Sequence, residues 1–328
     1  MYKVLITGAG SVMGQSIYKA LSQSEWATDI DIYFLNSLQD PAAFRFSSNF
    51  HSQTNIIGPL AKEASYISFI DNFVIENKID IIYPGTQHEL FKLSQYRQTR
   101  DIVACPLETT VNLTINKYMT AKLLHSSGVP VARTIRIEGG GIDKYPSQYP
   151  VVVKPNKSSA SRNVHICNSL NELNTVLDLI KHKNVSSAVC QEYLKGEEYT
   201  CGIYLDKYSN LETQIILKRE LAGDGSSLSG TTVKSREISN YLTKVIASFT
   251  AEKAFDYGHI NVQLRCTDDG PKLFEINGRL SSTETIKATF GFNSVEAYFY
   301  NIVLHKEYDK FNPNLNASFI RYYDEIYF

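Results

Sequence analysis

Two neighbouring strand patterns in the C-terminal third of the chain, at residues 259–265 and 273–277, constrain the fold more than any other feature. Side chains alternate between the two faces of a strand. The first strand would therefore bury its apolar members and leave a polar face of Asn261, Gln263 and Arg265. The second would direct Leu273, Glu275 and Asn277 to one side, and Phe274 and Ile276 to the other. Residues 268–270, which end in glycine, predict a three-residue hairpin loop between the strands.

This hairpin would bring oxygen-bearing side chains together. Gln263 would lie opposite Glu275 and Asn261 opposite Asn277, with Arg279 just beyond the end of the strand. Carboxylate and amide oxygens suit a hard cation such as Mg²⁺, which commonly binds together with phosphates. The alternative is a polar, solvated sheet face, which is the more frequent outcome for an isolated hairpin. Motifs in the rest of the chain are needed to distinguish a metal site from a solvated polar face.

The composition limits the class of protein. The chain has 328 residues, of which 43% are hydrophobic, enough for a substantial core in two or three domains. A net charge of -1 provides no basic field for nucleic acid or an anionic membrane, so we expect neither as a partner. The five cysteines form no CxxC pair, which indicates a reducing compartment. With no long apolar segment, we expect a cytoplasmic protein.

The first 105 residues alternate strand and helix, which predicts a parallel sheet with right-handed crossovers. The last of these predicted strands covers residues 102–104. Residues 7–14 form a glycine-rich turn that opens a helix and could hold a phosphate. The glycine spacing differs by one residue from the dinucleotide fingerprint, and the second strand ends in Asn36 rather than an acid. A tight strand-to-helix turn is therefore the favoured interpretation, and residues 84–86 predict another plain turn.

Two lysines in the middle of the chain lie at the ends of predicted elements, where they could contact a ligand. Lys117 lies at the start of a helix predicted over residues 116–126, and Lys154 ends a strand that precedes a small, polar loop. Such lysines can contact phosphates, although a lysine at a strand edge is also common. A capping box, Ser169-x-x-Glu172, predicts a packing helix that buries Leu170, Leu173, Leu177 and Ile180.

Further strands are predicted at residues 189–194, 198–205 and 214–220. The turn between the first two can offer backbone groups to a heterocycle and a carboxylate to a ribose. Lys218 and Arg219 are either ligands for a substrate carboxylate or exposed cations. Residues 222–231, rich in Gly and Ser, cannot form a core element and predict a loop that is disordered or closes over a ligand. The tyrosine-rich tail, residues 321–328, predicts a final strand that packs on the core, and the alternative is that it lines the substrate pocket.

The order of these parts resembles the ATP-grasp superfamily, in particular its carbamoyl-phosphate-synthetase-like carboxylate-amine ligases, over nearly the whole chain. The motifs that carry the resemblance most specifically are Asn261-Val262-Gln263 and Glu275-Ile276-Asn277-Gly278-Arg279. The implied fold class is α/β, an ATP-grasp fold of two α+β subdomains that grip ATP, preceded by a Rossmann-like parallel-sheet domain. The implied domains are residues 1–110 (pre-ATP-grasp), 111–195 (linker and lid) and 196–328 (C-terminal subdomain with the metal site).

The resemblance also implies roles for individual residues. Mg²⁺ or Mn²⁺ would bind Gln263, Glu275 and Asn277. ATP would contact eight residues: Lys117, Lys154, Ser159, Ser161, Glu192, Tyr193, Leu194 and Glu198. The catalytic residues would be Lys154, Arg219 and Arg279. Residues 158–163 stand where the family has a glycine-rich loop over the phosphates, and here that loop contains no glycine.

The implied function is ATP-dependent amide formation through an acyl phosphate. Its substrates would be a small-molecule carboxylate and an amine. An amino acid, a small peptide and a uronic-acid sugar all stay open as the carboxylate, and the protein could form a homodimer. One alternative is an NAD-dependent extended short-chain dehydrogenase or sugar epimerase, based on residues 7–9 and the Tyr118-x-x-x-Lys122 pattern, although Ser11 replaces an expected glycine. Another is an ATP-grasp protein that binds a nucleotide without turnover.

Overall fold

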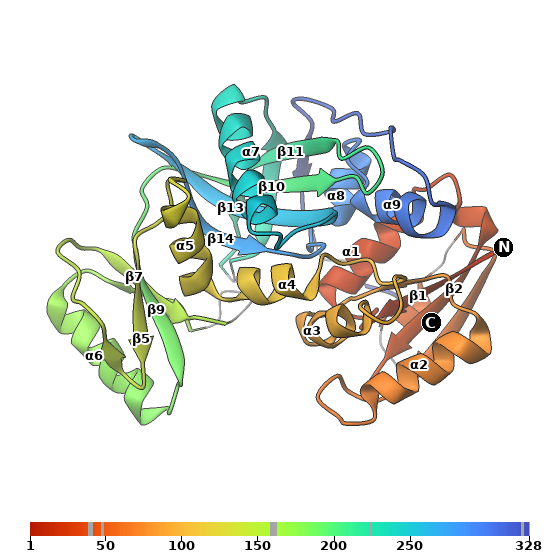
Figure 1. Ribbon diagram of the computed structural model, residues 1–328, viewed down its shortest axis with the longest axis horizontal. Coiled ribbons are helices and arrows are strands. Elements are labelled where there is room, and N and C mark those ends of the chain that lie inside the picture. Colours follow the sequence, from red (N-terminus) through yellow and green to blue (C-terminus); the bar gives the residue numbers. More distant parts are fainter. Residues whose placement is uncertain (39–41, 47–48, 158–162, 224, 323–324, 328) are drawn as a thin grey trace.

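The computed structural model describes residues 1–38, 42–46, 49–157, 163–223, 225–322 and 325–327. Within these ranges the chain forms a four-stranded sheet in the N-terminal part, a five-stranded sheet in the middle and a six-stranded sheet in the C-terminal part. Figure 1 shows the five-stranded sheet and its helix projecting from a body that the other two sheets form with their helices. Each of the three predicted segments thus contains one sheet, and the boundaries between domains stay a prediction.

The N-terminal sheet is parallel, as predicted, with the strand order β3-β2-β1-β4. Its strands are β1 (Tyr2–Thr7), β2 (Ile30–Asn36), β3 (Ser52–Ile57) and β4 (Ile81–Tyr83). Its helices are α1 (Val12–Leu21), α2 (Tyr66–Asn77) and α3 (Gln87–Tyr96), with short 3-10 helices at Ala27–Asp29 and Ala42–Arg45. Strand β3 was not predicted, because its polar, largely exposed sequence lacks an apolar face.

The strand predicted at residues 102–104 is wrong. Only an isolated bridge joins Val103 to Ile82. Pro106 follows almost at once and has no backbone N–H, so the ladder cannot continue.

The middle sheet has the order β6-β5-β9-β7-β8 and is covered on one face by α6. The strands are β5 (Thr134–Glu138), β6 (Gly141–Ile142), β7 (Val151–Pro155), β8 (His165–Cys167) and β9 (Ser187–Glu192), and the helix is α6 (Leu170–His182). The N-cap of the predicted capping box is confirmed, because Ser169 Oγ accepts a hydrogen bond from Glu172 N at 3.3 Å. The Glu172 carboxylate accepts from Asn168 N, one residue before the N-cap, at 2.9 Å. Leu170, predicted to be buried, is exposed. A helical side chain covers the turn that precedes it, and the first residue of a helix has no such turn.

The C-terminal sheet has the order β14-β13-β10-β11-β12-β15 and packs against α7 (Arg236–Ala251). Its strands are β10 (Glu197–Leu205), β11 (Glu212–Leu221), β12 (Ser227–Thr232), β13 (Gly258–Thr267), β14 (Gly270–Asn277) and β15 (Ser318–Ile320). The prediction of a loop over residues 222–231 is wrong for its second half, which is β12. This strand pairs with β11 and β15, so backbone hydrogen bonds on both sides stabilise a segment that has few apolar side chains.

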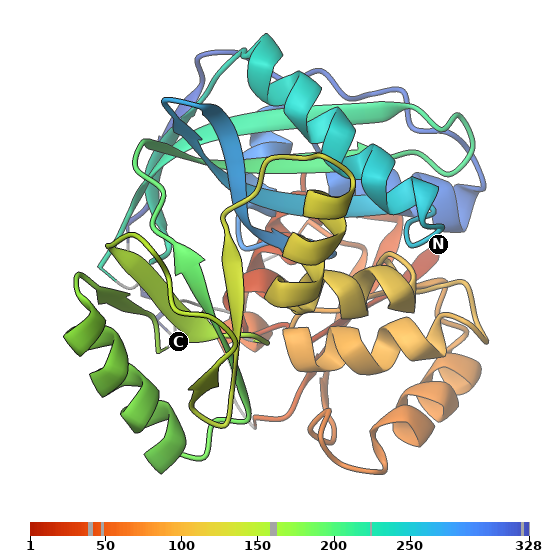
Figure 2. The same cartoon turned by 60° about the vertical axis from the view of Figure 1, so that its left-hand side comes forward.

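The remaining helices connect and support these sheets. They are α4 (Glu108–Ile115), α5 (Lys117–Ser126), α8 (Glu284–Thr289), α9 (Ser294–Phe299) and a π-helix at Tyr300–Leu304. Figure 2 shows α5 in front of β14, with the five-stranded sheet on one side and α3 and α4 on the other. One hydrophobic cluster contains residues of β1, α1 and α9, so the N-terminal and C-terminal sheets share a core. No helix in the described ranges has the length and apolar character needed to cross a membrane.

Candidate active site

The hairpin of β13 and β14 has the predicted register. Gln263 lies opposite Glu275, and Asn261 lies opposite Asn277. The loop between the strands ends at Gly270, whose φ of 96° is the left-handed conformation that the sequence predicted there. The polar face predicted from alternation in these two strands is therefore present near the strand ends.

A β-bulge changes the rest of the second strand. Leu264 pairs with Leu273, which leaves Phe274 as an extra residue. Leu273, predicted to share the face of Glu275, instead packs with Ile276 in the core beneath α7. Phe274 lies on the other side, and its backbone oxygen accepts a hydrogen bond from Lys154 Nζ at 3.2 Å. Because of this bulge, the predicted alternation is wrong for Leu273 and Phe274. The bulged residue Phe274 contacts Lys154, the lysine predicted to bind phosphate.

Glu275 is surrounded by buried cations. Lys117 and Lys154 are 6% and 7% exposed, and both interact with its carboxylate, as does Arg279. Burial alone would raise the pKa of Glu275, but the two lysines, a hydrogen bond from Asn277 and Arg279 together hold that pKa below its ordinary value. Three cations near one ionised carboxylate leave an excess of positive charge, which a polyphosphate can neutralise.

Hydrogen bonds to one asparagine bring the two lysines together. Asn116 caps α5, so Lys117 is the first residue of that helix. Asn156 follows β7 and accepts a hydrogen bond from Tyr118 N at 3.0 Å through Oδ1. Its backbone oxygen accepts from Lys117 N at 3.3 Å. These bonds fix the start of α5 against the end of β7, where Lys154 lies.

A second polar cluster joins Glu198 to two arginines. Its Oε1 accepts from Arg219 Nη2 and its Oε2 from Arg265 Nη2, each at 2.7 Å. Arg219 Nη2 also donates to Gln263 Oε1 at 2.9 Å. The side chain of Arg219 is 8% exposed and faces the site, whereas the neighbouring Lys218 is 48% exposed and lies on the other face of β11. Of the two interpretations left open, an exposed cation holds for Lys218 but not for Arg219.

The oxygen donors on the predicted metal-binding face fit Mg²⁺ that arrives with a nucleotide. They are one carboxylate, from Glu275, and the amides of Gln263 and Asn277, all hard oxygen ligands. Asn261 contributes no oxygen, because its Oδ1 accepts a hydrogen bond from Lys287 Nζ at 3.0 Å. In the part of the chain that the structure describes, no group of three His, Cys, Asp or Glu side chains could hold a metal. A set with one carboxylate needs phosphate oxygens to complete the coordination of Mg²⁺.

Lys287 itself was not predicted from the sequence. It is fully buried, and its Nζ also donates to Glu284 Oε1 at 3.0 Å and to Ser281 Oγ at 3.2 Å. Burial acts to raise the pKa of Glu284, but His259 and Lys287 lower it to about 2, so this carboxylate is ionised. The only signal in the sequence is a Glu and a Lys three positions apart on a short helix, which is a weak one.

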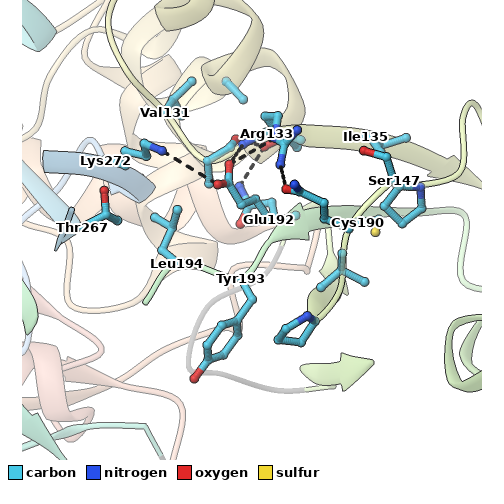
Figure 3. Close-up of a pocket in the computed structure, with 18 of the residues that line it drawn as sticks. Val131, Arg133, Ile135, Ser147, Cys190, Glu192, Tyr193, Leu194, Thr267 and Lys272 are labelled. Atoms are coloured by element: carbon cyan, nitrogen blue, oxygen red, sulfur yellow. Dashed lines mark hydrogen bonds and ion pairs between the residues drawn. The ribbon is translucent and has the colours of Figure 1, made fainter. Parts of the chain in front are cut away.

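A cavity of ≈ 840 Å³ lies along the predicted adenine hinge, residues 191–194. Figure 3 shows Arg133 and Lys272 pointing toward the carboxylate of Glu192, while Tyr193 points away from them. Arg133 Nε lies 3.4 Å from Glu192 Oε2, and Lys272 Nζ lies 3.8 Å from Glu192 Oε1. The Glu192 side chain is thus held by cations, and its backbone N–H already donates to the Arg133 backbone oxygen at 2.9 Å.

The cavity and the cationic cluster are distinct parts of the site. The residues that line the cavity include Tyr193 and Leu194 but not Lys154, Glu198 or Glu275. One hinge carbonyl is already used, because the backbone oxygen of Leu194 accepts from an Arg265 Nη1 donor at 2.9 Å. The predicted phosphate-covering residues Ser159 and Ser161 lie outside the described residues.

The comparisons with known proteins agree with this geometry. Residues 147–286 match the family model of the ATP-grasp domain. Phosphoribosylamine--glycine ligase of Caldanaerobacter subterraneus is 22% identical over 262 residues, which are 70% of this chain and 62% of that protein. The chain thus spans less than two thirds of the length of this curated relative.

Solved structures share the fold at low sequence identity. The L-amino acid ligase from Bacillus licheniformis superposes with a TM-score of 0.72 at 14% identity, covering 95% of this chain and 78% of that one. The biotin carboxylase domain of the Hydrogenobacter thermophilus 2-oxoglutarate carboxylase, in complex with MgADP and bicarbonate, gives 0.70 at 15% identity, covering 97% and 73%.

The chain has the ATP-grasp fold of these solved structures, and residues 147–286 match the ATP-grasp domain model, as the resemblance of its motifs predicted. In this fold the Tyr118-x-x-x-Lys122 pattern lies on α5, which packs against β5 and β14. Tyr118 and Lys122 both line the cavity beside the hinge. The dehydrogenase alternative nevertheless does not account for the ATP-grasp fold.

Proposed function

We propose that this protein is an ATP-dependent carboxylate-amine ligase. In the proposed reaction a substrate carboxylate oxygen attacks the γ-phosphorus of ATP, which forms an acyl phosphate and releases ADP. An amine then attacks the acyl carbon, the C–O bond to phosphate breaks, and an amide, inorganic phosphate and a proton are formed. The substrates are small molecules, and an amino acid, a small peptide or a uronic-acid sugar would each provide a carboxylate.

The observation that carries this proposal is the excess of buried cations around Glu275. Isolated buried charges are costly, so a protein keeps them where a ligand compensates them. Lys117 and Lys154, with Arg279, would compensate the phosphates of ATP. The relatives and the solved structures with this fold carry ligase and carboxylase names, which supports a nucleotide at this position and a carboxylate as its acceptor.

Each group of residues in the site would have its own role in the proposed reaction. Glu275, Gln263 and Asn277 would hold Mg²⁺, which supplies a Lewis acid for the phosphates when bound. Lys154 and Arg279 would stabilise the charge on the transferred phosphoryl group. Arg219 would bind the substrate carboxylate bidentately once its bonds to Glu198 are exchanged.

One observation favours a second candidate, a protein that binds a nucleotide without turnover. Glu198, proposed for the ribose, has both carboxylate oxygens occupied by Arg219 and Arg265. Gln263, proposed for the metal, accepts from the same Arg219. If these bonds persist with nucleotide bound, the metal site would stay incomplete and no chemistry would follow.

An ADP-release screen separates the two candidates. Amino acids, small peptides and uronic acids would be tested as carboxylates against a panel of amines, with ATP and Mg²⁺. We expect ADP only when both substrates and Mg²⁺ are present. ADP that never exceeds background for any pair, although ATP binds, would favour the non-catalytic candidate.

A variant then tests the assignment of the metal ligand. Glu275→Gln keeps the shape of the side chain but removes its charge, so we expect a folded protein with at least about a 100-fold loss of ADP release. The matched control is Glu63→Gln, a change at an exposed position of the N-terminal domain. Turnover of Glu275→Gln near that of the control would refute the metal role.

A further inference from the structure

The loops that follow β1 and β4 meet at the carboxyl edge of the N-terminal sheet. In the strand order β3-β2-β1-β4, the chain leaves β1 toward β2 and later returns to β4 on the other side of β1. Open α/β sheets bind ligands at such a switch point, outside the carboxyl ends of the strands. The two loops contact each other directly, since Ser11 Oγ donates to the Gly85 backbone oxygen at 2.5 Å.

A buried carboxylate, Glu89 of α3, lies between these loops. It is 8% exposed. A Cβ atom at Gly8 would come within 2.4 Å of Glu89 Oε2, so the glycine leaves the room that the carboxylate occupies. Gly8 also has a φ of 52°, which favours glycine. The predicted glycine turn is therefore shaped around an acidic side chain rather than around a phosphate.

Hydroxyl groups surround this carboxylate. Thr86 Oγ1 donates to Glu89 Oε2 at 2.8 Å. The Tyr66 side chain is 1% exposed, and its hydroxyl lies near Glu89 and Thr7 but forms no hydrogen bond of normal geometry. The Tyr66 hydroxyl thus interacts with the buried carboxylate of Glu89 without a hydrogen bond of ideal geometry.

The carboxylate lacks a cationic partner. Among the described residues, no Lys, Arg or His forms an ion pair with Glu89, in contrast to Glu198 and Glu284. Burial raises the pKa of Glu89 to about 7, even though Thr86, Thr7 and Tyr66 act to lower it. Ionised Glu89 is thus costly in the free protein, and a ligand cation would remove that cost.

The same edge of the sheet faces the proposed site of chemistry. Met13, in the first turn of α1, has its Sδ 3.4 Å from Arg279 Nη1. Ser16 Oγ accepts from Thr285 N at 3.0 Å, which fixes α1 against the segment that follows Arg279. These contacts place the start of α1, which follows the glycine turn, beside Arg279.

We propose that Glu89 binds the ammonium group of an amino-bearing substrate, with Thr86 and Tyr66 completing its hydrogen bonds. This inference rests on the proposed ligase function, because it places one of the two substrates of that reaction. The chemical class is a primary amine, on a molecule that reaches Arg279 with its other end. An α-amino acid and an amino sugar both have this chemistry.

Binding to the protein with Mg·ADP tests the inference without requiring turnover. The probes are the common L-amino acids, glucosamine, galactosamine and methylamine, each compared with its N-acetyl derivative by titration calorimetry. We expect at least one free amine to bind and its N-acetyl derivative, which carries no charge, to bind about 30-fold or more weakly. Equal affinity of the two forms, or no binding by any amine, would overturn the inference.

Variants test the residue. In Glu89→Gln we expect the affinity for the binding amine to fall about 30-fold or more and Mg·ADP binding to be unchanged. Glu76→Gln, at an exposed position of α2, is the matched control and should keep both affinities. An amine that binds Glu89→Gln as tightly as the control would contradict the role of Glu89. Loss of Mg·ADP binding by the unaltered protein would instead contradict the proposed function, so the two failures are distinguishable.

Discussion

At the scale of single residues, Lys154, which we propose binds phosphate, lowers the stability of the free protein. Burial lowers the pKa of Lys154 to about 8, Lys117 acts in the same direction, and Glu275 opposes both. A lysine whose pKa is lower in the folded than in the unfolded chain destabilises the folded state at pH 7, where it is charged. The charged Lys154 therefore lowers the free energy of unfolding of the free protein, and bound phosphates would offset this loss.

Lys154→Met should consequently have opposite effects on stability and binding. Removing the desolvated charge should raise the free energy of unfolding by about 1–3 kcal/mol. Removing a phosphate contact should weaken Mg·ADP binding about 30-fold or more. Urea unfolding and calorimetry measure the two effects, and Lys157→Met, at an exposed neighbour, should change neither. A variant that loses both stability and affinity would contradict this account.

The sequence identified the residues whose role is carried by a local motif, and the structure brings Lys117, Lys154 and Glu275 together. It could not identify Arg265 as a partner of Glu198, because that contact depends on the pairing of β10 with β13, 67 positions apart. Nor could it identify Lys287, since whether a lysine is buried depends on what packs around α8. Ion pairs between neighbouring strands depend on the tertiary structure, so a local sequence motif does not predict them.

At the scale of elements, alternation predicted the register of the hairpin but not its bulge. A bulge adds one residue to one strand and reverses the faces beyond it, and no residue type at Phe274 marks this in advance. Strand β12 was missed for a related reason, because its pairing with two neighbours, not its own side chains, makes it a strand. The strong signals, such as the capping box of α6, were those that are satisfied within one element.

Two glycines with positive φ provide a test at this scale. Gly196, between β9 and β10, has a φ of 130°, and a Cβ there would lie 1.8 Å from the Cys266 backbone oxygen. Gly139 has a φ of 56° and open space around it. We expect Gly139→Ala to lower the free energy of unfolding by about 1 kcal/mol and Gly196→Ala by about 3 kcal/mol or more. Urea unfolding measures both, and equal losses would mean that close backbone approach does not hold β10 against β13.

At the scale of the whole molecule, the five-stranded sheet with α6 has its own core, separate from the core that the N-terminal and C-terminal sheets share. Figure 1 shows this part projecting from the body. A unit with a separate, smaller core can move relative to the body when a ligand enters between them. We propose that it acts as the lid of the nucleotide site.

Hydrogen exchange tests the lid. Amides of β5, β7 and β9 should exchange faster than those of β1 and β13 in the free protein, and Mg·ADP should slow exchange in the hinge and in β7. Mass spectrometry of labelled peptides resolves these segments. Equal protection of both cores before and after addition of Mg·ADP would contradict a moving lid.

The central claim, that the cationic site around Glu275 transfers a phosphoryl group from ATP to a carboxylate, has one direct test. The carboxylate substrate found in the screen would be labelled with ¹⁸O in both oxygens, and the products would be analysed by mass spectrometry. An acyl phosphate requires that one labelled oxygen leave with phosphorus, so we predict one ¹⁸O in inorganic phosphate for each amide formed, with ADP as the nucleotide product. Unlabelled phosphate, or AMP and pyrophosphate with the label in AMP, would contradict it.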